Sequence, residues 1–196
     1  VPSVIAQLIN VLYNIVDRIY IGRIPEVGHL ALTGVGVTFP ILTLISAFSS
    51  FVGAGGAPLA AISLGKGERE KSEHILGNSF SMLLLFSVTL TLLFQLGKEP
   101  LLYMFGASDN TITYAMDYIT IYLWGTVFVQ IALGLNLFIT SQGQARIAML
   151  SVLIGAVINI VLDPIFIFGF HMGVKGAAYA TIFSQAVSAA WVLWFL

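Results

Sequence analysis

Long apolar stretches restrict what this chain can fold into more than any other feature of its sequence. Of the 196 residues, 58% are hydrophobic and only 9% are charged. Soluble domains carry about 25% charged residues, so this composition suits a chain surrounded by lipid. The stretches are unbroken and lack the alternation of apolar and polar residues that is typical of membrane β-barrels. We therefore predict an all-α membrane protein.

Six of these stretches reach the length of about 20 residues that a helix needs to cross a membrane. They occupy residues 1–22, 30–64, 75–96, 114–139, 147–170 and 176–196. The second is longer than a bilayer requires, so we expect it to tilt or to begin with a short piece at the interface. Because both ends of the sequence are apolar, we expect the chain to be part of a longer protein.

The basic residues give a weak indication of orientation. If the helices alternate in direction, the eight Lys and Arg residues divide evenly between the two sides of the membrane. The only basic cluster, Lys66, Arg69 and Lys71, favours the cytoplasm by the positive-inside rule. The amino-terminal end of the chain is then also cytoplasmic.

Several classes of function lack the residues that they would need. The net charge of −1 provides no basic surface for nucleic acid. The sequence has no cysteine, and its three histidines are too scattered for the spacing of a zinc site. A hydrolase would need a general base beside its nucleophilic serine, and the serines near residue 49 have none nearby in the sequence. We expect neither an enzyme nor a cofactor.

Two of the apolar stretches contain polar residues at helical spacing. In the first stretch these residues are Gln7, Asn10, Asn14 and Asp17. They fall on one helix face, with Tyr13 beside them. In the fifth stretch, Gly155, Asn159 and Asp163 follow one another at steps of four residues. A polar face cannot contact lipid tails, so we expect Tyr13, Asn10 and Asn14 to line a cavity.

The two aspartates are the most informative of these residues. An aspartate at the centre of a span raises the free energy of insertion by about 2.5–3.5 kcal/mol. Such acids commonly mark ion paths or proton relays. The alternative for Asp17 is a salt bridge or an interfacial anchor, and the alternative for Asp163 is a helix-end cap beside Pro164.

A pocket with two acids and neighbouring amides suits two kinds of chemistry. A carboxyl group shielded from water can take up and release a proton near neutral pH. Alternatively, carboxylate, amide and hydroxyl oxygens can together bind a hard cation such as sodium. Either ion can drive a conformational change if it binds one state more tightly than the other. The residues leave both alternatives open.

Several motifs, in one order along nearly the whole chain, resemble a transporter family. They are "NIVDRIYIGR", "GVGVTFPI", "VGAGGAPLAAISLGKGEREKSE", "SQGQAR" and "NIVLDPIFIFGFHMGVKGAAYAT". In this order the motifs are similar to those of the multidrug and toxic compound extrusion (MATE) transporters. The resemblance implies the amino-terminal six-helix lobe of a fold with twelve helices in two lobes, in a prokaryotic inner or plasma membrane.

The resemblance also implies an activity and a site. The family exports amphipathic organic cations, including drugs, in exchange for protons or sodium ions. Its cation site in this lobe corresponds to Asp17, Asn159, Asp163 and Thr181, which would hold the proton or sodium ion. The expected partners are cationic drugs, membrane lipid and the missing carboxy-terminal lobe, with no nucleic acid.

Two alternative functions remain open at this stage. A flippase for lipid-linked oligosaccharides shares the architecture of the wider superfamily, but we expect it to need basic residues in the membrane for the pyrophosphate. A receptor or a purely structural helical bundle would not need two acids with neighbouring amides inside the membrane.

Overall fold

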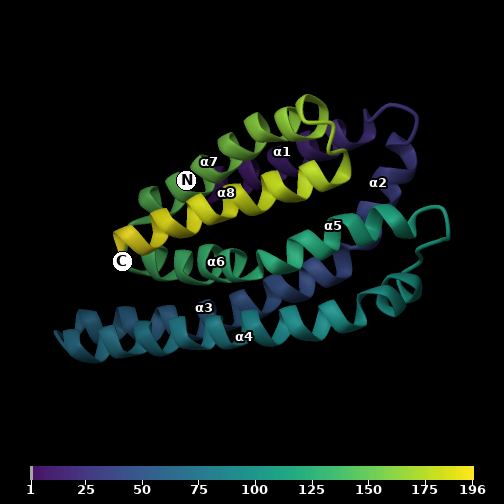
Figure 1. The fold of residues 1–196 in the computed structure, drawn as a ribbon. Coiled ribbons are helices and arrows are strands. Elements are labelled where there is room, and N and C mark those ends of the chain that lie inside the picture. Colours follow the sequence, from purple (N-terminus) through teal and green to yellow (C-terminus); the bar gives the residue numbers. More distant parts are fainter. Residues whose placement is uncertain (1) are drawn as a thin grey trace.

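The computed structural model describes residues 2–196, and every regular element among them is a helix (Figure 1). Eight α-helices and one short π-helix follow each other along the chain. They are α1 (Pro2–Gly22), α2 (Gly28–Val37), α3 (Phe39–Gly65), α4 (Arg69–Met104), α5 (Ile112–Trp124), α6 (Thr126–Ser141), α7 (Ala145–Pro164), η1 (Ile165–Gly169) and α8 (Val174–Phe195).

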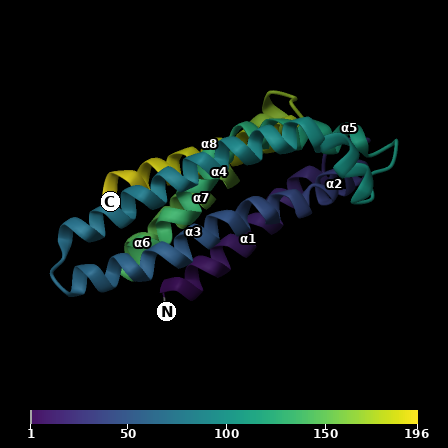
Figure 2. The ribbon, with the colours of Figure 1, turned by 90° about the horizontal axis from the view of Figure 1, so that it is seen from below.

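The helices fit the prediction of an all-α membrane protein, which is confirmed. Five spans are long and apolar enough to cross a bilayer: α1, α3, α4, α8, and α7 together with η1. The pair α5 and α6 brings the number to six if the two are counted as one bent span. Both views show α1 beginning and α8 ending at one end of the bundle, where the α3–α4 hairpin extends furthest (Figures 1 and 2). A chain that crosses the membrane an even number of times has both of its ends on the same side.

The long second stretch, residues 30–64, is divided between α2 and α3. Thr38 lies between the two helices, and its hydroxyl donates a hydrogen bond of 2.7 Å to the carbonyl oxygen of Val35. Pro40 lies in the first turn of α3, where its missing N–H group is tolerated but where it cannot extend the hydrogen bonds of α2. The result is a helix of 10 residues followed by one of 27 residues.

The fourth stretch, residues 114–139, differs from the expected single helix. It consists of α5 and α6, which are bent by 61° at Gly125. The side chain of Ile182 on α8 occupies the space that a β-carbon on residue 125 would need. Two carbonyl groups near the end of α5 accept side-chain hydrogen bonds from α4. Thr91 donates to Leu123 at 2.9 Å, and Gln95 donates to Thr120 at 2.9 Å.

The helices pack in two groups that α6 joins. One group contains α1, α7 and α8, and the other contains α3 and α4 (Figure 1). The α6 helix contacts both α3 and α8. At the α3–α6 contact Gln130 is fully buried. It accepts a hydrogen bond of 2.8 Å from Ser49 and donates one of 3.0 Å to the carbonyl oxygen of Ile45.

Small residues allow α3 and α6 to approach each other closely. A β-carbon added to Gly53 of α3 would lie 2.6 Å from the carbonyl oxygen of Gly134 on α6. A β-carbon added to Gly55, two residues further along α3, would meet nothing within 4 Å. Helices in lipid associate through this kind of close packing, because the lipid removes the hydrophobic drive between them.

We predict that Gly53→Ala destabilises the full-length transporter and that Gly55→Ala does not. The added methyl group at residue 53 forces α3 and α6 apart, and overpacking of this kind is unfavourable by about 1–3 kcal/mol. At residue 55 the methyl group enters open space, and alanine favours the helix by about 1 kcal/mol relative to glycine. The measurement is the midpoint of thermal unfolding in detergent. Equal midpoints for the two variants would contradict this account of the contact.

Candidate cation site between α1, α7 and α8

The two aspartates within the apolar stretches meet in the structure. Asp163 lies at the end of α7 and is 0% exposed, while Asp17 lies on α1 and is 9% exposed. Their helices run side by side. This brings the two carboxyl groups close enough to share a hydrogen bond when one of them is protonated. Residues 146 positions apart in the sequence therefore form one polar cluster.

Asn159 and Thr181 complete the predicted set. The amide nitrogen of Asn159, one turn before Asp163 on α7, donates to the Oδ1 atom of Asp163 at 3.3 Å. The same amide lies 3.5 Å from the hydroxyl oxygen of Thr181 on α8, to which it also donates. Asn159 is 1% exposed. The structure thus brings together all four residues expected at the site, from three helices.

Three oxygen atoms of this cluster are buried without a hydrogen-bond donor among residues 2–196. They are Oδ1 of Asp17, Oδ1 of Asn159 and Oδ2 of Asp163. A buried acceptor without a partner is normally unfavourable by about 1–3 kcal/mol. Their grouping is typical of a place where a proton or a hard cation binds, because a carboxylate oxygen can accept a proton and carboxylate and carbonyl oxygens suit hard cations. The described residues contain no group of three or more His, Cys, Asp and Glu side chains that could hold a metal ion.

No basic side chain neutralises the two acids. Within residues 2–196, no Lys, Arg or His nitrogen lies within 4.0 Å of the carboxylate oxygens of Asp17 or Asp163. Arg18, which follows Asp17 in the sequence, instead lies over the ring of Phe39, with its guanidinium carbon 4.3 Å from the ring centroid. The geometry therefore gives no support to a salt bridge between Asp17 and its neighbour.

A tyrosine pair borders the cluster on the α5 side. The Tyr118 hydroxyl lies within hydrogen-bond reach of Thr181. The rings of Tyr118 and Tyr122 stack with their centroids 6.0 Å apart, and both are buried. The sequence contains the signal for this pair, two tyrosines one helical turn apart in an apolar stretch. That signal alone does not say which helix they face.

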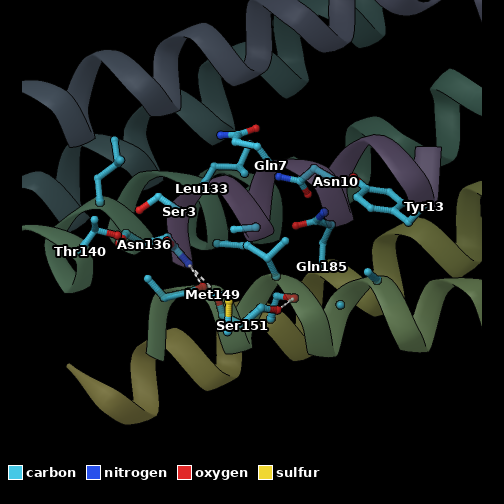
Figure 3. Close-up of a pocket in the computed structure, with 18 of the residues that line it drawn as sticks. Ser3, Gln7, Asn10, Tyr13, Leu133, Asn136, Thr140, Met149, Ser151 and Gln185 are labelled. Carbon is cyan, nitrogen blue, oxygen red and sulfur yellow. Dashed lines mark hydrogen bonds between the residues drawn. The ribbon is translucent and has the colours of Figure 1, made fainter. Parts of the chain in front are cut away.

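A pocket of about 270 Å³ lies between α1, α3, α6, α7 and α8, and none of the four residues of the cluster is among those that line it (Figure 3). Its wall contains Gly155 of α7, one turn before Asn159, and Ser184 of α8, close to Thr181. The pocket therefore approaches the acids along two of the helices that hold them. The polar residues labelled on its wall are Ser3, Gln7, Asn10, Tyr13, Asn136, Thr140, Ser151 and Gln185.

The expected cavity residues have different positions relative to this pocket. Asn10 and Tyr13 line it. Asn14 is exposed and outside the lining, and its amide donates a hydrogen bond of 2.7 Å to the carbonyl oxygen of Asn10. Sequence reasoning missed Asn136, whose amide donates to the Ser151 hydroxyl across the α6–α7 contact. The signal for Asn136 in the sequence is a single amide side chain within an apolar stretch.

The backbone changes form immediately after Asp163. Pro164 ends α7 and the π-helix η1 follows it, consistent with the donor that proline lacks. The first turn of α8 packs directly on η1, since a β-carbon on Gly176 would lie 2.7 Å from the carbonyl carbon of Phe166. Single π-turns inside α-helical spans occur frequently at functional sites.

Comparisons with known proteins identify the family and the relatives of this chain. The model of the family MatE matches residues 2–165. The chain is 30% identical to the multidrug export protein MepA of Staphylococcus haemolyticus over 187 residues, which are 95% of this chain and 41% of MepA. It is 26% identical to an FAD transporter of Shewanella oneidensis, over 95% of this chain and 42% of that protein.

Solved structures of MATE transporters are similar to this chain in fold. A crystal structure of MATE in the bent conformation superposes with a TM-score of 0.92 at 30% identity, over 100% of this chain and 43% of the other. An outward-facing multidrug resistance MATE family transporter superposes with a TM-score of 0.90 at 30% identity, over 100% and 43%.

The chain spans about two fifths of the length of these relatives. One lobe of a two-lobe transporter has this size, and the motifs of the sequence are those of the amino-terminal lobe. The named relatives are transporters rather than enzymes, and the apolar helices make this chain an integral membrane protein that crosses the bilayer several times. It therefore belongs to the MatE family.

Proposed function

We propose that the complete transporter is a secondary antiporter that exports amphipathic organic cations in exchange for protons or sodium ions. In this lobe Asp17, Asn159, Asp163 and Thr181 form the coupling site. The observation that carries the proposal is the contact of two buried carboxyl groups that have no Lys, Arg or His nitrogen of residues 2–196 within 4.0 Å. The choice of substrate rests on the relatives that are named multidrug export proteins.

The contact between the two acids explains how an ion and a drug would compete. Two negative charges on carboxyl groups that are close enough to share a hydrogen bond repel each other strongly in a low-dielectric site. The site therefore needs a bound proton or cation. One proton or sodium ion bound there lowers the negative charge of the pair by one unit and so weakens the attraction for an organic cation in the neighbouring pocket. Release of the ion restores that unit of charge, and the two ligands therefore compete.

The unpartnered oxygens indicate which residues would hold each coupling ion. A proton would lie on one of the two carboxyl groups and be shared with the other. A sodium ion would take the three oxygens of Asp17, Asn159 and Asp163 that have no donor within the described part of the chain, and the Thr181 hydroxyl. The coupling follows if the ion binds one conformation of the lobe more tightly than the other.

The pocket supports an organic cation in preference to a pyrophosphate-linked lipid. Its wall contains amide, hydroxyl and apolar side chains, with no Lys or Arg among the described residues. A flippase for lipid-linked oligosaccharides would need positive charge to bind the pyrophosphate. Aromatic and amide groups such as Tyr13 and Asn10 suit an aromatic cation.

We predict that Asp163→Asn abolishes ion-coupled efflux in the full-length transporter. The amide keeps the size and most hydrogen bonds of the side chain but cannot take up a proton or carry a charge. The measurement is dye efflux from proteoliposomes under an imposed pH or sodium gradient, at equal protein content. Asp109→Asn is the control, because Asp109 is exposed and its neutralisation should change stability by less than about 0.5 kcal/mol. Unchanged ion dependence in Asp163→Asn would overturn the assignment.

We also predict that Asp17→Asn and Asp163→Asn are not additive. If the two acids act as one site, either single change removes the coupling, and the double variant loses no more efflux than each single variant. Glu99→Gln, which changes an exposed acid at the end of the bundle, should retain wild-type efflux. The same proteoliposome assay measures the four variants and the wild type. Losses that multiply in the double variant would show two independent sites instead.

A further inference from the structure

A second cavity lies outside the pocket described above, where α1 and α7 begin. It is an open groove of about 450 Å³ lined by Pro2, Ile5, Arg146, Met149 and Leu150. It shares only Met149 with the first pocket. Its residues remain open to the surroundings of the bundle, with Ile5 40% and Leu150 37% exposed. Four of its five lining residues are apolar, and the fifth is an arginine.

The charged residue and the apolar residues of the groove lie at different depths in the membrane. Arg146 is in the first turn of α7, and Leu150 lies one turn further along the helix, about 6 Å deeper at 1.5 Å per residue. The apolar part of α7 begins directly after Arg146. Arg146 therefore lies where the hydrocarbon core meets the headgroups, and Met149 and Leu150 lie inside the core. A phospholipid has the same order of groups, a phosphate followed by acyl chains.

Arg146 has no acidic partner in the part of the chain that the structure describes. Arg69, Lys71 and Lys175 form ion pairs with Glu73, Glu68 and Asp117 at 2.9, 3.1 and 3.4 Å. No carboxylate of residues 2–196 lies within 4.0 Å of the Arg146 guanidinium. An exposed guanidinium at the level of the headgroups is a strong partner for phosphate, because its planar N–H groups match two phosphate oxygens.

We propose that this groove binds one anionic phospholipid, with its phosphate on Arg146 and an acyl chain along Ile5, Met149 and Leu150. The charge complementarity selects an anionic headgroup, and the apolar lining selects a lipid over a free phosphate ion. Basic sites between membrane helices commonly bind anionic headgroups in this way. The site is separate from the coupling acids, so its test does not depend on the efflux mechanism.

The experiment uses the full-length transporter in phosphatidylcholine nanodiscs that contain a trace of photoreactive phosphatidylglycerol with a diazirine on its acyl chain. Peptide mass spectrometry after illumination locates the label. We expect labelling of the segments around Ile5 and around Met149 and Leu150. Unlabelled phosphatidylglycerol should compete and inorganic phosphate should not. The same analogue of phosphatidylcholine should label these segments less.

Three variants test the two parts of the proposal. Arg146→Gln should lower labelling by about five-fold, the effect typical of one basic residue at an anionic membrane surface. Lys66→Gln is the matched control, because it removes an exposed, unpaired charge outside the groove and should leave labelling unchanged. Leu150→Trp fills the groove but keeps Arg146, and it should also abolish labelling.

Each contrary result would overturn the proposal. Equal labelling in Arg146→Gln and the wild type would mean that the groove accepts any lipid chain. Competition by inorganic phosphate would indicate a site for free anions. Unchanged labelling in Leu150→Trp would place the acyl chain elsewhere. Matching thermal midpoints of all variants in detergent ensure that a loss of labelling reports the site rather than unfolding.

Discussion

The contact between the Asp17 and Asp163 carboxyl groups requires α1 and α7 to run side by side, and much of the packing follows from this requirement. Two acids cannot lie in hydrocarbon without a ligand or a surrounding shell of polar groups. The polar groups here are Asn159 and Thr181, with the Tyr118 hydroxyl within hydrogen-bond reach of Thr181. Three helices must therefore converge on one point, and small residues such as Gly155 and Gly176 allow that convergence.

The rest of the bundle provides a stable frame for this point. The α3 and α6 helices are held together by the close approach at Gly53 and by the hydrogen bonds of the buried Gln130. None of these groups is charged. Gln130 at the α3–α6 contact thus has hydrogen-bond partners, whereas three buried oxygens of the acid cluster have no donor among residues 2–196. The hydrogen bonds of Gln130 stabilise the fold, and the three oxygens are available for ligands.

The sequence was sufficient for the membrane class, and it singled out the four residues that the structure brings together between α1, α7 and α8. A polar residue in an apolar stretch stands out whatever its partners are, and the motifs assigned Thr181, which composition alone would not have selected. The bend at Gly125 could not be predicted, since it depends on the Ile182 side chain of another helix and on Thr91 and Gln95 of a third. The contacts of Asn136 and Tyr118 could not be predicted either, because they join parts of the chain that are distant in the sequence.

The bend between α5 and α6 has a mechanical consequence for the lobe. Ile182, which fills the space at Gly125, is the neighbour of Thr181 on α8. Through this contact α8, the helix that carries Thr181, packs directly against the point at which the span bends. The angle between α5 and α6 and the position of α8 are therefore not independent, because any displacement of α8 changes the space that Ile182 fills beside Gly125.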